Sequence, residues 1–250
     1  ECLVAAGYKD IETRRIEAKK RGKLLGFGTS NSITGVANTN FEHIEIRFDA
    51  TGGVTMLSGA MDHGQGHGTT FKQVLSDRLG VEPEKVVYRY GDTDKVAHGV
   101  GTFNARVAVF VSAAIVEAAD KIIEKGKRIA AHMLEAAEGD IAFGDGAFTV
   151  VGTDRSVSLE DVAKTAYVKP KLPPDIEPGL YEHGQFGASS GDGSTFPNGV
   201  HVAEVEVDTD TGRVELVRYT AIDDAGTILN PLLFDGQIHG GIVQGAGQIL

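Results

Sequence analysis

The sequence contains almost no cysteine, since Cys2 is the only one among 250 residues. A single thiol cannot supply an internal disulfide framework, a multi-thiolate zinc site or a four-cysteine iron–sulfur cluster. Any such centre that works together with this chain must therefore be contributed by another polypeptide.

Positive charge and long apolar runs are also scarce. Lys and Arg total 24 against 35 Asp and Glu, which gives a formal net charge of −11. This charge repels nucleic acid phosphates and anionic lipid, so we expect neither nucleic acid nor membrane as a partner. Apolar runs such as Val107–Val116 fall short of the roughly 20 residues that span a bilayer, and the first residues lack a signal-peptide layout. We therefore predict a soluble, cytoplasmic protein.

The residue pattern predicts an α+β fold with mixed sheets and packed helices. A chain of this length with 41% hydrophobic residues can bury the core of one large domain or of two closely joined lobes. In Glu42–Phe48 the apolar Ile44, Ile46 and Phe48 alternate with charged residues, which predicts a strand with one buried face. Turn residues at Asp49–Gly53 then predict a hairpin with a second strand at 54–57.

Further along the chain, apolar spacing and turn residues predict helices and strands in alternation. These elements are a helix through Phe71, Val74, Leu75 and Leu79, with Thr69 or Thr70 as N-cap and Gly80 as stop; a strand at Val86–Tyr90; a long helix from Val107 to about Glu138, ended by Gly139; a hairpin at Ile141–Val151 around Gly144–Gly146; and a short helix capped at Ser158–Asp161.

We predict three segments in the domain organisation. Residues 1–167 form a first lobe, and residues 168–199, rich in proline and glycine, form a connection that is a boundary, a partner-binding loop or both. Residues 200–250 contain a hairpin over His201–Tyr219 and a glycine-rich helix that starts at Asn230-Pro231. There is no start methionine and no capped or polar tail, so we expect a chain truncated at both ends.

The string Gly-Gln-x-His-Gly occurs twice, at 64–68 and at 236–240, and each copy adjoins a predicted helix. A helix amino terminus presents unpaired N–H groups and the positive end of the helix dipole, so it can bind a phosphate without a lysine. The first copy is neither a Walker A loop nor a dinucleotide fingerprint. Glycine-rich loops before helices also serve as simple tight turns, so both alternatives stay open at this point.

Other polar residues form weaker patterns. His63 and His67 are four residues apart, but the glycines between them disfavour a helix and no third ligand stands nearby, so we predict no metal site in this chain. Asp223 and Asp224 fit a carboxylate pair for acid–base catalysis, although two Asp residues before Ala-Gly more often form a turn. The three glutamines of the last helix form either a buried amide set or a solvated stripe: Gln237, Gln244 and Gln248.

Taken together and in order, five segments resemble the molybdenum-binding large subunit of the xanthine dehydrogenase and aldehyde oxidase family, with most likeness to carbon monoxide dehydrogenase-type large subunits. The resemblance spans nearly the whole chain. Its segments are Asp62–Thr70, Gly101–Arg106, His201–Asp208, Ile222–Pro231 and Asp235–Gly245.

The resemblance implies a molybdopterin cofactor with molybdenum, in its plain form or as the cytosine dinucleotide. It implies that the segments before the two long helices face the phosphates and the pterin, and that an amide from the last helix reaches the pterin. Helix amino termini, small residues and amides suit such an anionic, heteroatom-rich ligand. The cofactor-binding residues implied are Gln65, Gly66, His67, Thr69, Thr70, Gly101, Thr102, Phe103, Asn104, Ala105, Arg106 and Gln237.

The chain departs from the family pattern at several positions. Asn104-Ala105 stands where the family has Gly-Ser or a similar pair, and Val107 stands in place of a serine. The family's base glutamate is expected beyond Leu250 and its substrate loop before Glu1, and Cys2 does not belong to that loop. We therefore predict no catalytic residue within this chain and a fragment that is not competent on its own.

The resemblance also implies partners for the complete enzyme: iron–sulfur and FAD subunits, a higher oligomer, and a small-molecule substrate such as carbon monoxide, an aldehyde or an aromatic heterocycle. Two alternatives stay open. One is a binding or scaffold domain that kept the fold and lost the cofactor. The other is an unrelated phosphate-binding enzyme, in which Gln65 and Gln237 would lie far apart.

Overall fold

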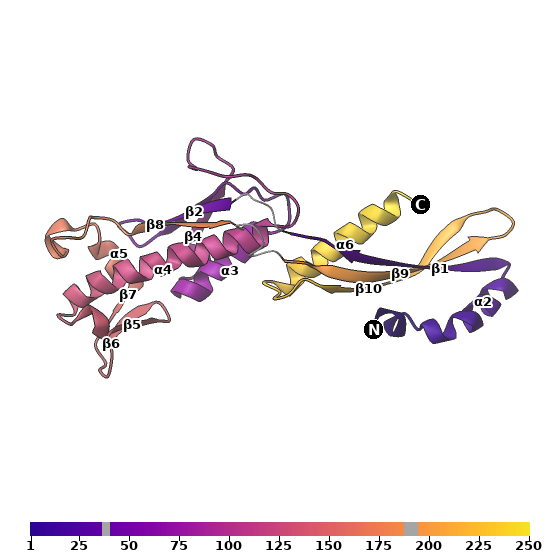
Figure 1. The fold of residues 1–250 in the computed structure, drawn as a ribbon, viewed down its shortest axis with the longest axis horizontal. Coiled ribbons are helices and arrows are strands. Elements are labelled where there is room, and N and C mark those ends of the chain that lie inside the picture. Colours follow the sequence, from indigo (N-terminus) through magenta and orange to yellow (C-terminus); the bar gives the residue numbers. More distant parts are fainter. Residues whose placement is uncertain (37–40, 188–194) are drawn as a thin grey trace. The chain divides into compact units, whose positions relative to one another are not determined.

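The computed structural model describes residues 1–36, 41–187 and 195–250 (Figure 1). The chain divides into two compact units: a terminal unit of residues 1–36 and 194–250, and a central unit of residues 37–193. The predicted α+β class is confirmed, because each unit contains helices and a sheet, and the four-stranded sheet of the central unit combines parallel and antiparallel pairs. The division differs from the predicted one, which placed residues 1–36 in the same lobe as residues up to 167.

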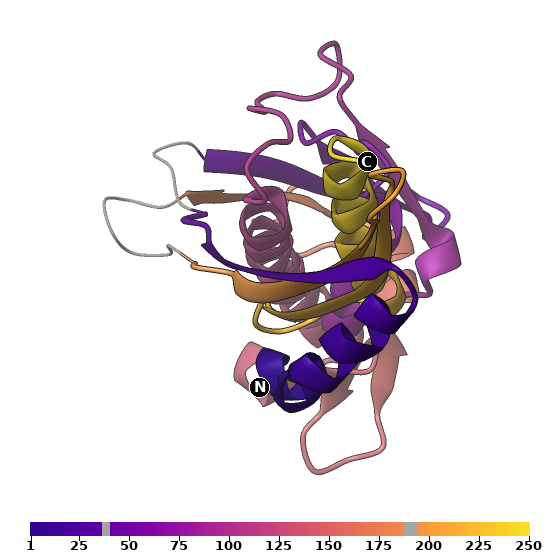
Figure 2. The ribbon, with the colours of Figure 1, turned by 90° about the vertical axis from the view of Figure 1, so that its right-hand side faces the viewer.

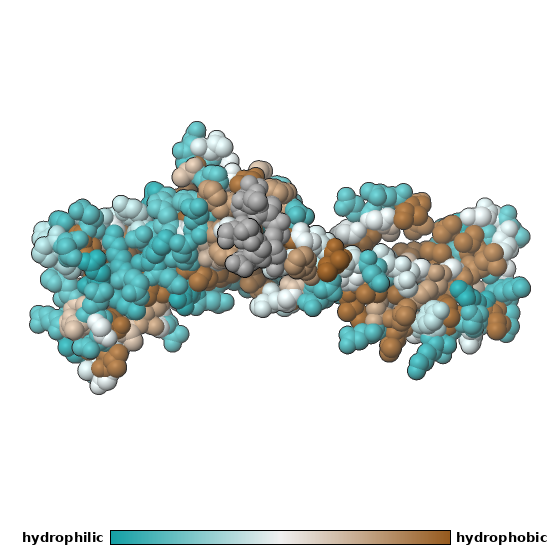
Figure 3. Space-filling model, in the orientation of Figure 1, coloured by the Kyte–Doolittle hydropathy of each residue, from teal (hydrophilic) through white to brown (hydrophobic). Residues whose placement is uncertain are grey.

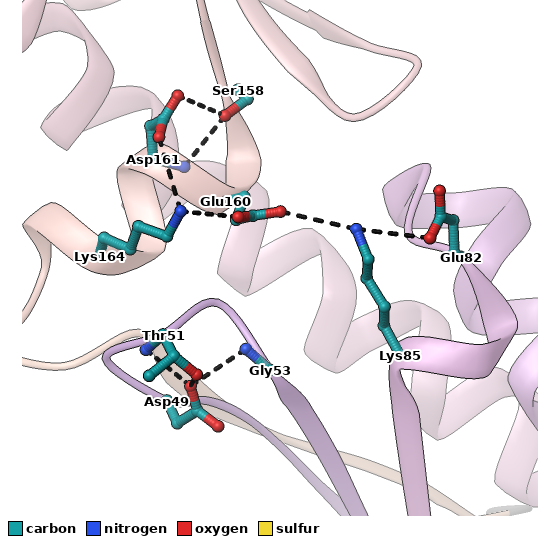
Figure 4. A network of polar contacts seen from close by, with 9 residues as sticks. All are labelled: Asp49, Thr51, Gly53, Glu82, Lys85, Ser158, Glu160, Asp161 and Lys164. Atoms are coloured by element: carbon teal, nitrogen blue, oxygen red, sulfur yellow. Dashed lines mark hydrogen bonds and ion pairs between the residues drawn. The ribbon is translucent and has the colours of Figure 1, made fainter.

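The central unit is built on a four-stranded sheet in the order β4-β3-β2-β8. The predicted hairpin is confirmed: β2 (Phe41–Phe48) and β3 (Val54–Ser58) pair antiparallel, with Phe48 opposite Val54. Oδ1 of Asp49 accepts hydrogen bonds from the N–H of Thr51 at 2.7 Å and of Gly53 at 3.0 Å, which closes the turn (Figure 4).

Helix α3 (His67–Leu79) connects β3 to β4 (Val86–Tyr90), and the two strands run parallel. The predicted stop is confirmed, since Gly80 has a φ of 66° and closes the helix as its C-cap. The predicted N-cap is wrong. The helix begins at His67, two residues before Thr69, and its N-cap is Gly66 with a φ of 80° and no side-chain hydrogen bond. The left-handed turn at this glycine starts the helix before either threonine is reached.

Helix α4 (Val107–Met133) packs against α3 and against β2 and β8 (Figures 1 and 2). Its predicted apolar face is buried, with Val111, Ala114 and Ile122 fully covered. The predicted end near Glu138 is wrong by about one turn. Glu135 takes a left-handed φ of 48°, and the N–H of Ala136 bonds back to the carbonyl of Ala131, so the chain leaves the helix axis before Gly139 is reached.

A small three-stranded sheet follows, made of β5 (Ile141–Gly144), β6 (Ala147–Val150) and β7 (Ser156–Ser158). The predicted hairpin around Gly144–Gly146 is confirmed. Helix α5 (Leu159–Thr165) begins at Ser158 as predicted: the Ser158 hydroxyl oxygen accepts the N–H of Asp161 at 3.0 Å and donates to its carboxylate at 2.7 Å (Figure 4).

Replacing Ser158 with alanine is expected to lower the free energy of unfolding of the central unit by roughly 1 kcal/mol, because the first turn of α5 loses its cap. Urea unfolding of the variant measures this change. Ser156→Ala, an exposed serine two residues earlier, is the control and is expected to change little. Equal effects of the two substitutions would show that the cap contributes nothing.

The segment predicted as a connection, residues 168–199, contains strand β8 (Tyr181–Gly187), which pairs antiparallel with β2. The strand has no apolar alternation of its own, because it includes Gly184 and Gly187 and its only large apolar interior residue is Phe186. Gly184 is buried directly against α4, where an added Cβ would lie 1.9 Å from the carbonyl oxygen of Ala114. Tertiary packing against the helix, rather than local pattern, therefore specifies this strand.

The terminal unit contains a three-stranded sheet in the order β1-β9-β10, with β1 (Lys23–Ile33) paired to β9 (Asn198–Asp208) (Figure 2). The predicted hairpin of β9 and β10 (Val214–Asp224) is confirmed. Two short helices, α1 (Cys2–Ala5) and α2 (Ile11–Lys20), precede the sheet. On β9 the carboxylate of Glu204 is buried and accepts two hydrogen bonds from Arg14 of α2, at 2.9 and 3.1 Å, which ties that helix to the sheet.

Helix α6 (Pro231–Gly247) starts as predicted, since the side chain of Asn230 accepts the N–H of Leu233 at 3.1 Å. None of its residues is buried, and Leu232 and Val243 are 82% and 70% exposed. Figure 3 shows hydrophobic residues on the surface of both units. No described helix has the length and apolar character needed to cross a membrane.

Candidate functional site

Two glycine-rich loops meet in the central unit. We call residues 59–66, which lead into α3, the first loop, and residues 99–106, which lead into α4, the second loop. A Cβ added to Gly59 would lie 2.3 Å from the Cα of Gly99, so the two backbones touch. The hydroxyl of Thr102 also donates to the carbonyl of Met61 at 2.5 Å. The structure therefore brings together two segments that are 40 residues apart in the sequence.

Asp62 organises the first loop from within. Its Oδ1 accepts the N–H of Gly64 at 2.9 Å and of Gly66 at 3.3 Å, and its Oδ2 accepts the N–H of Gly68 at 3.2 Å. Burial raises the pKa of the Asp62 carboxyl, but these three N–H donors and the neighbouring His67 outweigh it, so the pKa is lowered. Three amides of the first Gly-Gln-x-His-Gly string, for which phosphate binding and a simple tight turn were the two alternatives, thus bind a carboxylate of the chain itself.

Replacing Asp62 with asparagine is expected to destabilise the central unit by roughly 1 kcal/mol at pH 7, because an amide nitrogen replaces one accepting oxygen. A carboxyl with a lowered pKa in the folded state stabilises the fold above its unfolded pKa of about 3.9 and stops doing so as the pH falls through the folded value. The difference between variant and parent should therefore begin to shrink as the pH falls below about 4 and vanish below the folded pKa.

Urea unfolding measured from pH 7 downward tests this expectation, with the exposed Asp154→Asn as control. If the loss of unfolding free energy in Asp62→Asn stays constant with pH, the charge of this carboxylate does not stabilise the loop.

The other predicted residues of the first segment differ in their surroundings. Gln65 turns its side-chain oxygen inward to accept the N–H of His63, while Thr69 is exposed. His67 is buried and stacks on Phe71 with ring centroids 4.7 Å apart, and its Nδ1 has no hydrogen-bond partner. Burial lowers the pKa of His67 against the opposing effect of the Asp62 carboxylate, so the ring is neutral at pH 7. Within the described residues no group of three or more His, Cys, Asp or Glu side chains is placed to hold a metal ion.

The backbone of the second loop is unusual. Asn104 and Ala105 both adopt left-handed conformations, with φ of 51° and 53°, which L residues other than asparagine, aspartate and glycine seldom adopt. Gly101, with a φ of 90°, has no atom within 4 Å of the position that a Cβ would take. Phe103 is 44% exposed. The loop thus presents open backbone to its surroundings and leads into α4, which has no side-chain N-cap.

Arg106, by contrast, has a completely buried side chain. Its Nη2 donates to Oε1 of Glu42 and to the carbonyl of Gly101, the latter at 3.2 Å. The guanidinium carbon lies 4.8 Å from the ring centroid of Phe103 and 5.4 Å from that of Phe110. The Glu42 side chain is also completely buried.

Glu42 is not among the predicted site residues, although the sequence contains a signal for its burial. In β2 the residues of even number face the core, and Ile44, Ile46 and Phe48 are all buried. The same alternation places Glu42 on the apolar face. A charged residue in register with a buried face predicts a buried partner of opposite charge.

Gln237 belongs to a different unit from the other predicted residues. It lies on α6 of the terminal unit and is exposed, as are Gln244 and Gln248. Its convergence with Gln65 on one ligand stays a prediction. Asp224 accepts the N–H of Gly226 at 2.9 Å, which confirms turn chemistry at that position.

Asp223 instead forms part of a polar chain on the sheet of the terminal unit. Its carboxylate lies 3.1 Å from Nε2 of His201, whose Nδ1 lies 2.9 Å from the hydroxyl of Tyr219. Burial, and then the nearby Asp223 carboxylate, raise the pKa of Tyr219. These contacts join β9 to β10 directly before the turn that leads to α6.

Comparison with known proteins matches the entire chain, residues 1–250, to the profile of the molybdopterin cofactor-binding domain. The large subunit of nicotine 6-hydroxylase from Paenarthrobacter nicotinovorans is 38% identical over 254 residues, which cover 96% of this chain and 31% of that protein. The large chain of carbon monoxide dehydrogenase from Hydrogenophaga pseudoflava is 36% identical, over 89% of this chain and 27% of that one.

Solved structures agree with these sequence relationships. Quinoline 2-oxidoreductase from Pseudomonas putida 86 superposes with a TM-score of 0.86 at 33% identity, over 100% of this chain and 33% of that chain. The present chain therefore spans about a third of the length of the proteins that it matches.

Proposed function

This chain belongs to the molybdopterin cofactor-binding domains of the molybdenum hydroxylase large subunits, and on that premise we propose that its first and second loops together hold part of the cofactor. The observation that carries the proposal is the contact between the loops: Gly59 against Gly99, and the hydroxyl of Thr102 on the carbonyl of Met61. This contact fixes two glycine-rich segments as one surface. The family relationship favours this reading over a scaffold domain without a cofactor and over an unrelated phosphate-binding enzyme.

The residues present suit a ligand with phosphate and ring heteroatoms. A Cβ at Gly64 or Gly101 would meet no atom within 4 Å, so a ligand can approach the backbone at both positions. Anion binding would fall to the N–H groups at the start of α4 and to the hydroxyl of Thr69, since Asp62 already accepts N–H groups at the start of α3. The amide of Gln65 would pair with ring heteroatoms, and the role proposed for Gln237 is the same from the terminal unit.

The proposed activity of the complete enzyme is oxidation or hydroxylation of a small molecule. Molybdenum held by the pterin, in its plain or cytosine dinucleotide form, would supply the redox chemistry. The proposed partners are subunits that carry iron–sulfur clusters and FAD, assembled into a higher oligomer. The two relatives are a large subunit and a large chain, which fits such a complex. Nicotine, carbon monoxide and quinoline, in the names of related proteins, span the substrate class.

The test is chemical analysis of the full-length protein purified from its source. We expect about one molybdenum and one pterin per subunit, with cytidine monophosphate released on acid hydrolysis if the dinucleotide form is present. A well-folded subunit with neither molybdenum nor pterin would refute the proposal and favour the scaffold alternative. Thr69→Val in the same protein should lower the cofactor content while leaving the thermal unfolding of the cofactor-free form unchanged, because Thr69 is exposed.

A further inference from the structure

The ion pair of Glu42 and Arg106 is the most completely buried charged contact among the described residues. Both side chains have 0% exposure, one from β2 and one from the residue before α4. Only Nη2 of the guanidinium and Oε1 of the carboxylate have partners. Nε and Nη1 of Arg106 and Oε2 of Glu42 are buried without any hydrogen bond.

Such a pair is poorly explained as a source of stability. Removing two charges from water costs several kcal/mol per ion, and the mutual attraction offsets this only when the remaining donors and acceptors are also satisfied. Here three of them are not. Apolar residues of similar volume often serve a core at least as well, so stability alone does not account for the pair.

What the pair specifies is the shape of the second loop. The guanidinium lies beside Glu42 and donates to the carbonyl of Gly101. This hydrogen bond links the last residue of the second loop to its third residue. The ring of Phe103 covers one approach to the same guanidinium. Ala105, which lies between them, is thereby held in a left-handed conformation that alanine seldom adopts.

We infer that Glu42 is a positioning residue of the cofactor site: through Arg106 it sets the backbone of the second loop, and Arg106 acts as the hub of that loop rather than as a cationic ligand of the cofactor. The inference rests on the proposed function. A guanidinium that is neutralised by a carboxylate and shielded from solvent offers no charge to an outside anion. With the loop held by this ion pair, the groups left open to a ligand are the backbone at Gly101 and the start of α4.

The decisive variant is Glu42→Gln in the full-length protein, with Glu45→Gln as matched control. Glu45 lies on the same strand, but its carboxylate pairs with Arg47, which is 55% exposed.

The first readout is trypsin cleavage after Arg106, compared with cleavage after Arg78 on α3. Trypsin must extract the arginine side chain, so we expect cleavage after Arg106 to accelerate at least tenfold in Glu42→Gln and cleavage after Arg78 to stay unchanged. The second readout is molybdenum and pterin content, expected to fall at least tenfold.

The double variant Glu42→Met with Arg106→Met separates positioning from stability. It removes both charges, so we expect its unfolding temperature to match that of the cofactor-free parent while its cofactor content stays low. If Glu42→Gln unfolds the central unit, trypsin cleavage after Arg78 accelerates as much as cleavage after Arg106. The cofactor content of the double variant then tests the inference. Normal cofactor content in a folded double variant, or a Glu42→Gln protein that matches Glu45→Gln in both readouts, would overturn the inference. If the parent itself holds no cofactor, the proposed function fails. The trypsin cleavage pattern alone then tests whether the ion pair of Glu42 and Arg106 holds the second loop.

Discussion

A Gly59→Ala substitution is expected to lower the cofactor content of the full-length protein by at least about tenfold, which corresponds to roughly 1.4 kcal/mol of lost binding. The new methyl carbon would lie 2.3 Å from the Cα of Gly99 and 3.0 Å from the carbonyl oxygen of His98. Both contacts are with backbone, which cannot rotate away, so the two loops must separate. The hydrogen bond from Thr102 to Met61 stretches as they do. The surface on which the proposed site depends is then lost.

Metal and pterin analysis of the purified variant measures this effect, and Gly99→Ala should reproduce it because the contact is mutual, at 2.4 Å from the Cα of Gly59. Gly139→Ala is the control, since a Cβ at that position meets no atom within 4 Å. Gly59→Ala protein with a full complement of cofactor would show that the contact between the loops is incidental to binding.

A Gly184→Ala substitution is expected to destabilise the central unit by more than roughly 3 kcal/mol, above the usual range for overpacking. The added carbon would lie 1.9 Å from the carbonyl oxygen of Ala114 and 2.8 Å from the backbone nitrogen of Ala118, both in the middle of α4. Strand β8 would have to move off the helix, and its pairing with β2 would move with it. Since a whole domain is stable by only about 5–15 kcal/mol, much of the protein should be unfolded at 37 °C.

Urea unfolding monitored by circular dichroism measures the loss. The matched control is Gly144→Ala, another strand glycine, for which an added Cβ meets no atom within 4 Å. The prediction fails if the two variants unfold within about 1 kcal/mol of each other, a difference that ordinary surface substitutions also produce.

Several elements were predictable from local pattern because their signals are local. The alternation in β2 and β9 and the turn residues between β2 and β3 occur within about ten residues of the structure that they specify. Gly80 and Asn230 were recognised as helix boundaries for the same reason, since a cap is a contact between near neighbours. The family resemblance rested on motifs of the same local kind, and the profile match confirms it.

The two main errors have different origins. Thr69 and Thr70 have the right chemistry for an N-cap, but Asp62, farther upstream, and the left-handed Gly66 started the helix earlier. Strand β8 has no apolar alternation, because its place is defined by the backbone of α4 lying on Gly184. At β8 a contact with a distant part of the chain outweighed the local pattern, whereas at α3 a second local contact, six residues long, outweighed the capping preference of the threonines.

The sequence by itself determined which faces of these elements are apolar, where most turns fall and to which family the chain belongs. Periodicity and turn chemistry carry that information within a few residues. Only the tertiary structure decided which faces meet: that residues 23–33 join residues 198–208 in one sheet, that Gly59 touches Gly99, and that Glu42 neutralises Arg106. A residue pattern records that a side chain will be buried but not what will cover it, because the covering element comes from a distant part of the chain and is selected by packing.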